Sequence, residues 1–215
     1  MVVLWKGLSD LRPMKKHSRK NAVGGKSSAS KSASPRSSSF GKPRSRSKAS
    51  PLPSEWSEFI ALLCAHRVRF LIVGGHAFGV IGRIRTTKDL DLLVEPTIIN
   101  AKRVCAALAE FGFEALARCS KEFTKPERMA ILGREPLRID LMTSITGVTF
   151  ARAWRGRTKA TLGGHEVGVL GRDEFIANKL ATARPQDLAD VAVIEEMEKI
   201  SISRCHGSGS RRQRG

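Results

Sequence analysis

The uneven distribution of charge along the chain is the feature that most limits how it can fold. Of the 215 residues, the first 50 contain 13 lysines and arginines and a single acid, and residues 204–215 contain four arginines and no acid. Residues 51–203 are nearly balanced, with 21 basic and 19 acidic side chains. The formal net charge of +18 therefore belongs mainly to the two ends, and the sequence predicts one folded domain over residues 51–203.

The two basic ends, residues 1–50 and 204–215, are predicted to be disordered tails. Residues 27–50 contain 11 serines, and Lys, Arg and Pro account for most of the remainder. Such a segment cannot bury enough apolar surface to offset the entropy lost on ordering. Three interpretations of the N-terminal tail stay open: nonspecific contact with nucleic acid, an organelle transit peptide, and an extension without its own function.

Several classes of protein are excluded by composition. The longest nearly apolar run, residues 70–82, contains a histidine and four glycines and is too short to span a bilayer. The apolar start, residues 1–5, is too short for the core of a secretory signal. The four cysteines form no CxxC pair, so neither a structural zinc site nor a disulfide scaffold is expected. These observations predict a cytoplasmic protein without membrane contact.

Hydrophobic spacing within the central segment predicts both helices and strands. Helices are expected at residues 55–66, 76–81, 100–111, 150–154, 174–182 and 186–199, the first with Ser54 as its N-cap. Strands are expected at residues 69–73, 89–94, 128–132, 137–142, 159–162 and 167–170, the last four as two hairpins. This order predicts a single α/β or α+β domain, with a mixed β-sheet flanked by helices.

Two aspartates on one predicted strand form the main candidate site. Asp89 and Asp91 are two positions apart, so both side chains project from the same face of the strand. Adjacent carboxylates repel each other unless a cation or water offsets their charge, and such oxygen ligands suit Mg²⁺. Asp140 is a lone acid in the apolar strand 137–142, and a neighbouring strand would bring it beside the pair. Three carboxylates placed in this way can hold two metal ions.

A structural interpretation of the same acids stays open. Asp89 and Asp91 would then lie on a solvated face of the sheet. Asp140 would pair with Arg138 or Arg134 and would contribute to the fold rather than to chemistry.

Residues ahead of the acidic pair suggest a phosphate site. Gly74 and Gly75 follow a predicted strand and open a short helix, where backbone N–H groups can bind phosphate at close approach. Arg83, Arg85 and Lys88 lie between this turn and the aspartates, where their charges would neutralise a triphosphate. Neither a P-loop nor a dinucleotide-binding GxGxxG pattern is present.

This arrangement resembles the DNA polymerase β-like nucleotidyltransferase superfamily. The shared pattern is a strand, Gly-Gly, 13 intervening residues, Asp-Leu-Asp, and a later lone Asp on a strand. Residues 73–96 are similar to the small bacterial branch of minimal nucleotidyltransferases and AbiEii-toxin-like proteins, and the resemblance covers roughly residues 55–200. It implies a nucleotidyltransferase-like fold, two Mg²⁺ ions, and transfer of a nucleoside monophosphate from an NTP such as ATP to an acceptor.

The resemblance also implies roles for individual residues. Gly74 and Gly75 would hold the triphosphate, although the superfamily often has Ser at the position of Gly75. Asp89 and Asp91 would bind both metal ions. Asp140 would bind the catalytic ion and help to activate the acceptor hydroxyl.

The segment 178–190 is also similar to the end of those small proteins. Lys179 and Arg184 are expected to reach the nucleotide or the acceptor, and Lys179 is the stronger candidate. The alternative is that Arg184 pairs with Asp187 or Asp190 and orders the last helix.

Taken together, these residues predict a Mg²⁺-dependent nucleotidyltransferase whose acceptor is an RNA such as tRNA, a protein or a small molecule. One alternative is a non-catalytic nucleotide-binding or toxin–antitoxin regulatory module of the same fold. Another is a basic protein whose tails bind nucleic acid while the core serves as a scaffold.

Overall fold

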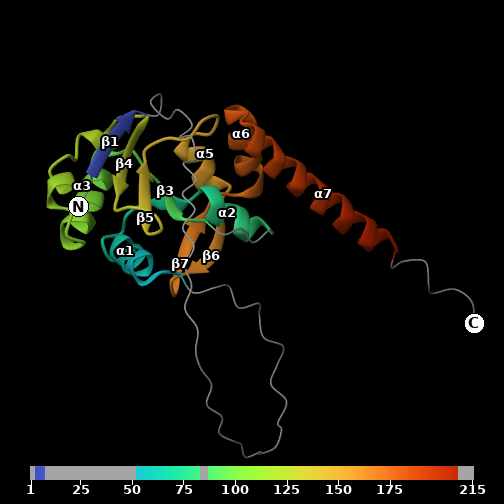
Figure 1. Ribbon diagram of the computed structural model, residues 1–215, viewed down its shortest axis with the longest axis horizontal. Helices are drawn as coiled ribbons and strands as arrows, with labels where there is room; N and C mark the ends of the chain where they lie inside the picture. Colours follow the sequence, from blue (N-terminus) through green and yellow to red (C-terminus); the bar gives the residue numbers. More distant parts are fainter. Residues whose placement is uncertain (1–2, 8–51, 83–86, 208–215) are drawn as a thin grey trace, which may run out of the picture. The chain divides into compact units, whose positions relative to one another are not determined.

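A seven-stranded mixed β-sheet, flanked by helices, organises the chain (Figure 1). The computed structural model describes residues 3–7, 52–82 and 87–207, with side chains described for 52–82 and 87–200. The strands are β1 (Val3–Gly7), β2 (Phe70–Ile72), β3 (Asp89–Val94), β4 (Arg128–Leu132), β5 (Arg138–Met142), β6 (Thr158–Leu162) and β7 (His165–Val169). The helices are α1 (Ser54–Ala65), α2 (Gly74–Ile81), α3 (Ile98–Glu110), α4 (Glu114–Ala117), α5 (Phe150–Arg155), α6 (Arg172–Thr182) and α7 (Pro185–Gly207), with a short 3₁₀ helix η2 (Glu122–Thr124).

The strand order is β1-β4-β5-β3-β2-β7-β6. Two neighbouring pairs, β3 with β5 and β2 with β7, run parallel, and the other four pairs run antiparallel. Both predicted hairpins, β4–β5 and β6–β7, are present. The prediction of an α/β domain with a mixed sheet is therefore confirmed. Within the described part of the chain, no helix is both long and apolar enough to cross a membrane.

Strand β3 lies at the centre of this sheet, between β5 and β2, and its residues alternate between polar and apolar over its first half. Leu90 and Leu92 are fully buried, whereas Asp89 and Asp91 keep some contact with solvent. Since successive strand residues point to opposite faces, the leucines pack into the core and the aspartates project from the other face. After Leu92 the strand becomes apolar on both faces, as expected of a central strand covered on each side.

Helix α3 is fixed to the sheet by polar contacts at its first turn. Thr97 is the N-cap, and its side chain accepts a hydrogen bond from the backbone N–H of Asn100. Asn100 is buried, and its amide group donates to the carbonyl oxygens of Arg69 and Glu95 and accepts from the N–H of Arg69. The Asn100 side chain is the hydrogen-bond partner of the Arg69 N–H, and it adds a second donor to two carbonyl oxygens that also accept from the backbone N–H groups of Glu95 and Thr97.

The main apolar core lies between the sheet and the helices. Helices α1 and α3 contact each other, and the rings of Phe59 and Phe111 approach to 4.8 Å between centroids. The fully buried side chains of these two helices are Phe59, Ile60, Leu63, Val104, Ala107 and Leu108. The expected N-cap of α1 is wrong by one residue, because Pro53 is the N-cap and the Ser54 hydroxyl donates to Glu55 instead.

The structure extends the fold beyond the expected boundaries of 51 and 203. Residues 3–7, expected to belong to a tail, form edge strand β1 and pair antiparallel with β4 from Val3↔Leu132 to Gly7↔Arg128. Helix α7 continues to Gly207, four residues into the expected C-terminal tail. A short run of β-branched and aromatic residues is sufficient for an edge strand even in a basic segment. The rest of the predicted tails, residues 8–51 and 208–215, lies outside the described residues.

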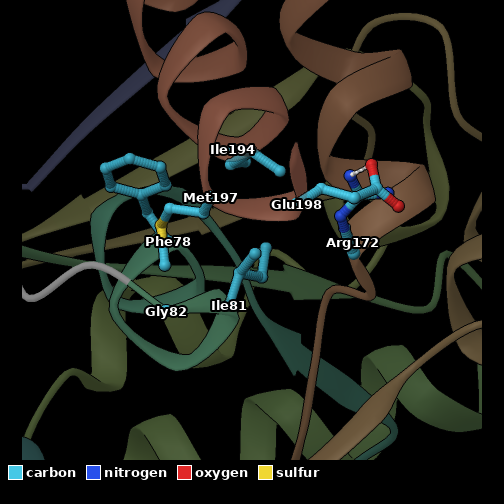
Figure 2. Close-up of a pocket in the computed structure, with 7 residues that line it drawn as sticks. All are labelled: Phe78, Ile81, Gly82, Arg172, Ile194, Met197 and Glu198. Carbon is cyan, nitrogen blue, oxygen red and sulfur yellow. Dashed lines mark hydrogen bonds and ion pairs between the residues drawn. The ribbon is translucent and has the colours of Figure 1, made fainter. Parts of the chain in front are cut away.

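A pocket of about 270 Å³ lies between α2, α6 and α7 (Figure 2). Its lining residues are Phe78, Ile81, Gly82, Arg172, Ile194, Met197 and Glu198. Arg172 and Glu198 form an ion pair at one side, and a Cβ on Gly82 would lie 2.6 Å from the Cε atom of Met197. Helix α7 therefore packs directly against the C-terminal end of α2, the helix whose first residue is Gly74.

Candidate metal site

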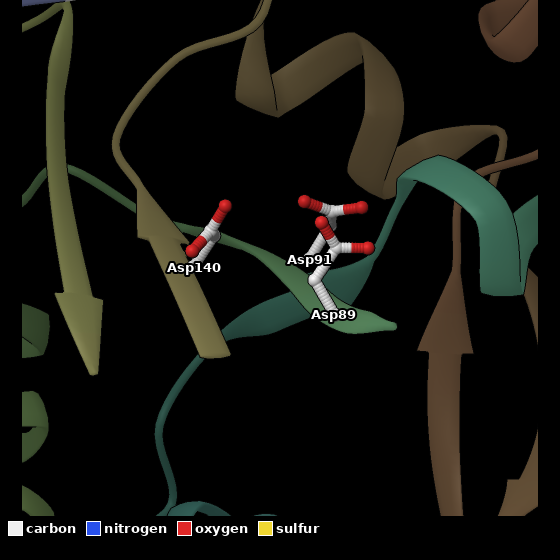
Figure 3. A group of neighbouring side chains, drawn as sticks. All are labelled: Asp89, Asp91 and Asp140. Atoms are coloured by element: carbon white, nitrogen blue, oxygen red, sulfur yellow. The ribbon is translucent and has the colours of Figure 1, made fainter. Parts of the chain in front are cut away.

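The register between β3 and β5 brings three carboxylates together. These parallel strands pair Asp91 with Asp140 and Asp89 with Arg138. One carboxylate oxygen from each of the three aspartates lies within 4.8 Å of the other two (Figure 3). The prediction that a neighbouring strand carries Asp140 to the Asp-Leu-Asp pair is confirmed. The three side chains form a group that can hold a metal ion.

The three carboxylates differ in exposure and in their electrostatic surroundings. The side chain of Asp140 is 5% exposed and that of Asp89 is 30% exposed. Burial, together with the nearby charges of Asp89 and Asp140, raises the pKa of Asp91 to about 7, against the lowering effects of Arg138 and Lys179. At neutral pH this cluster therefore favours either a proton or an added cation beside Asp91.

A guanidinium group bridges two of the three acids. Nη2 of Arg138 donates to Oδ2 of Asp89 at 2.6 Å and to Oδ2 of Asp140 at 2.9 Å. The pairing of Asp140 with Arg138, which the sequence left open as a structural alternative, is therefore present. The additional contact of Arg138 with Asp89 was not predicted, because it depends on the register of two strands that are far apart in sequence.

Gly74 places the first turn of α2 directly against the acidic cluster. Its φ is +60°, a conformation that favours glycine, and a Cβ at this position would lie 2.1 Å from Oδ2 of Asp91. The N–H of Val73 donates to the carbonyl oxygen of Asp91 at 3.0 Å, which fixes the start of the helix to β3. The backbone of α2 and the Asp91 carboxylate are therefore immediate neighbours.

Gly75 is confined by a different residue. A Cβ here would lie 2.3 Å from Cγ2 of Thr87, so the chain has no room for the Ser often found at this position in the superfamily that it resembles. Thr87 in turn donates to the carbonyl oxygen of Asp89 at 2.7 Å. A glycine at position 75 thus allows Thr87 to anchor the start of β3. The role of Gly74 and Gly75 in phosphate binding stays a prediction.

His76 completes this arrangement through a hydrogen bond within the fold. Its Nε2 lies 3.1 Å from the Thr87 hydroxyl, whose single proton is already donated to Asp89. Nε2 must therefore be the protonated nitrogen, donating to Thr87. Burial lowers the pKa of His76 against the opposing charge of Asp89, so the ring is neutral at pH 7.

The predicted basic ligands lie in different places. Arg83 and Arg85 lie outside the described residues. Lys88 is exposed, with its Nζ 3.7 Å from Glu135. Lys179 on α6 is largely buried, with its Nζ 2.5 Å from Asp187 and 3.0 Å from Asp190, both on α7.

One alternative from the sequence was that Arg184 pairs with Asp187 or Asp190. Arg184 is exposed and lies 3.8 Å from Asp187, so it is a peripheral partner. The closer partner of Asp187 is Lys179, whose charge also lowers the pKa of Asp91. Its binding of nucleotide stays a prediction.

Comparison with known proteins gives a limited result. No protein-family model matches the chain, and no curated protein matches it. Among solved structures it is similar to an antigenic nucleotidyltransferase-like protein from Paracoccidioides brasiliensis, with a TM-score of 0.40 and 14% sequence identity. The alignment covers 69% of this chain and 79% of that protein. A similarity of this size leaves the activity to be inferred from the chain's own residues.

Proposed function

We propose that the protein is a Mg²⁺-dependent nucleotidyltransferase that moves a nucleoside monophosphate from an NTP to an acceptor hydroxyl. One observation carries the proposal: Asp89, Asp91 and Asp140 converge from two adjacent parallel strands, against the first residue of α2. Carboxylates provide oxygen ligands for a cation, and the backbone N–H groups beside them at a helix N-terminus provide hydrogen-bond donors for a phosphate.

The donor set fits a hard divalent cation. Three carboxylates within 4.8 Å of one another offer oxygen ligands, which Mg²⁺ prefers. Burial first, and then the neighbouring charges of Asp89 and Asp140, raise the pKa of Asp91, and a bound cation would offset both effects. Asp89, Asp91 and Asp140 would hold the two expected ions. When bound, these ions would neutralise the charge on the transferred phosphate and stabilise the attacking and leaving oxygens.

The chain's own groups then have distinct tasks. Backbone N–H groups at Gly74 and Gly75 bind the triphosphate, and the charges of Arg85, Lys88 and Lys179 hold it in place. Asp140, the most buried acid, takes the proton of the acceptor hydroxyl. The acceptor oxygen forms a bond to the α-phosphorus, the bond from that phosphorus to the bridging oxygen breaks, and pyrophosphate leaves.

A second candidate function is a nucleotide-binding module without turnover. It is favoured by the bridge from Arg138 to Asp89 and Asp140, which already supplies a positive charge within the acidic cluster. A cluster whose charge is partly offset in this way can hold its shape without performing chemistry.

The test uses the full chain with Mg²⁺ and each of four α-³²P-labelled NTPs, offering cellular RNA and cellular protein as acceptors. The Asp89→Asn/Asp91→Asn double variant removes two acids of the cluster. The matched control is Glu166→Gln, which changes an exposed acid on β7. Label that appears on one acceptor class, persists in the control and is lost in the double variant supports the transferase.

Two other results would decide against transfer. Mg²⁺-dependent NTP binding without any labelled acceptor would favour the module without turnover. An absence of both binding and transfer would overturn the proposed function in either form.

A further inference from the structure

Four side chains form a compact charged patch on one face of the sheet. Asp89 and Asp91 share a face of β3, and Arg138 and Asp140 share a face of β5, because each pair is two residues apart. In the parallel register, Arg138 stands beside Asp89 and Asp140 stands beside Asp91. The only cationic member of the patch is therefore built into the same strand as one of the predicted metal ligands.

The guanidinium and a metal ion would compete for the same oxygens. Nη2 of Arg138 contacts Oδ2 of Asp89 and Oδ2 of Asp140, at 2.6 and 2.9 Å. A Mg²⁺ ion held by those two oxygens needs contacts of about 2.0–2.1 Å to each, in the space that this nitrogen occupies. Oxygens that accept N–H bonds from Arg138 cannot at the same time direct those lone pairs at an ion.

Arg138 is held in a way that permits its release. Its side chain is 29% exposed, and its Nε is buried without a hydrogen-bond partner among the described residues. Its Nη1 lies 3.8 Å from Glu135, an exposed carboxylate three residues earlier and outside the acidic cluster. The polar contacts of the side chain are therefore at its tip, and Glu135 is already a second, more distant partner for the guanidinium.

The charge balance of the patch leaves room for a divalent ion. Three ionised carboxylates and one guanidinium carry a net charge of −2. Among the described residues, Lys179 is a second cation whose charge acts on Asp91, and it is already paired with Asp187 and Asp190. One guanidinium thus stabilises the patch without neutralising it.

We propose that Arg138 is a built-in counter-cation that a divalent metal ion must displace, so that this residue sets the metal concentration at which the site becomes loaded. This inference rests on the metal site of the proposed function. Arg138 acts as a positioning residue: it holds Asp89 and Asp140 together in the metal-free protein and moves toward Glu135 when the ion binds.

The test measures metal binding directly, without nucleotide. Mn²⁺ affinity of the full chain is determined by the electron paramagnetic resonance signal of the free ion, for wild type, Arg138→Met and Arg138→Lys. The matched control is Arg134→Met, an exposed arginine in the same β4–β5 hairpin. The Asp89→Asn/Asp91→Asn double variant identifies binding at this cluster by its loss.

The expected result is a Kd for Mn²⁺ about tenfold lower in Arg138→Met, an intermediate Kd in Arg138→Lys, and no change in Arg134→Met. Thermal unfolding gives a second readout. Arg138→Met melts at a lower temperature than wild type in EDTA, and Mn²⁺ raises its melting temperature by more than it raises that of wild type. If Arg138→Met does not fold, the affinity of Arg138→Lys decides.

Three results would contradict the inference. An unchanged or higher Kd in the folded Arg138 variants would overturn the role of Arg138 while leaving the metal site intact. Absence of Mn²⁺ binding in wild type as well as in the variants would overturn the metal site itself. Binding that survives in the Asp89→Asn/Asp91→Asn double variant would place the ion elsewhere and would overturn both.

Discussion

Gly74 and Asp91 are in such close contact that no side chain fits between them. A Cβ on Gly74 would lie 2.1 Å from Oδ2 of Asp91, and the residue also has a φ of +60°. Both the backbone conformation and the available space therefore require glycine at this position. Helix α2 begins at Gly74, so its first turn lies directly against the Asp91 carboxylate. The acidic cluster and the predicted phosphate site are consequently parts of one structural unit.

The Gly74→Ala variant should disrupt the contact between the first turn of α2 and the Asp91 carboxylate. The methyl group would displace the Asp91 carboxylate, and a left-handed conformation costs a non-glycine residue about 1–2 kcal/mol. We expect the free energy of unfolding to fall by about 2 kcal/mol or more in urea denaturation, and Mn²⁺ affinity to fall at least tenfold. The control is Gly79→Ala in the same helix, where an added Cβ meets nothing within 4 Å. This change should stabilise the protein by up to about 1 kcal/mol. Equal behaviour of the two variants would refute the close contact.

The pH dependence of the metal-free protein should report the electrostatics of Asp91. Its pKa is raised from an ordinary value of 3.8 to about 7, so between these values the folded state binds more protons than the unfolded state. The free energy of unfolding should therefore decrease as pH rises from about 4 to about 7, by on the order of 3 kcal/mol. Urea denaturation in EDTA across this range is the measurement.

Comparison of two variants tests whether Asp91 causes this pH dependence of the free energy of unfolding. Asp91→Asn should lose this decrease, because an amide does not titrate. Asp173→Asn, which changes an exposed acid on α6, should keep it. Parallel pH profiles for wild type and Asp91→Asn would show that the carboxylate is not perturbed.

Asn100 should be the most sensitive polar position outside the site. Replacing it with Ala leaves the N–H of Arg69 and the carbonyl oxygens of Arg69 and Glu95 without their side-chain partner. The two carbonyl oxygens keep their backbone partners, the N–H groups of Glu95 and Thr97, so the Arg69 N–H is the group left unpaired. An unpaired buried group costs about 1–3 kcal/mol, so a loss of about 2 kcal/mol in the free energy of unfolding is expected. Thr97→Ala removes only the N-cap of the same helix and should cost about 1 kcal/mol. Chemical denaturation that ranks Thr97→Ala as the more harmful change would contradict this account.

The sequence was informative where the physical signal is local. The alternation of β3 predicted that Asp89 and Asp91 share one face, and the spacing of apolar residues predicted every helix from α1 to α3 except for small shifts at the ends. Residues two or four positions apart carry this information themselves. The glycines after β2 likewise indicated a tight turn at the start of α2.

For contacts between segments that are distant in the sequence, the sequence alone left more than one interpretation open. The pairing of Asp91 with Asp140 depends on the register of β3 against β5, which no local pattern specifies. The bridge from Arg138 to Asp89 follows from that same register. Strand β1 was missed because the basic composition of the segment outweighed five residues whose stability comes from pairing with β4.

Lys179 has two candidate roles, in the α6–α7 ion pairs and in nucleotide binding. Its replacement should lower the stability of the protein in the first role and its affinity for NTP in the second. In the structural role, Lys179 is the partner of Asp187 and Asp190, two largely buried acids. Its replacement by Met would remove the ammonium group from this largely buried ion-pair network. Breaking a buried pair by removing one partner costs about 3–5 kcal/mol. Lys179→Met should therefore lower the free energy of unfolding by about 3 kcal/mol, in the absence of any nucleotide.

The matched control is Lys159→Met, which breaks an exposed pair with Glu166 and should cost less than about 1 kcal/mol. Chemical denaturation of both variants without ligand measures the structural role of Lys179, and NTP binding by the folded fraction measures the other. If Lys179→Met is as stable as Lys159→Met yet binds NTP at least tenfold more weakly, Lys179 acts on the nucleotide and not on the α6–α7 contact. If stability falls and the affinity of the folded protein for NTP is unchanged, the role of Lys179 is structural, because its ammonium group pairs with Asp187 and Asp190 and does not bind the nucleotide.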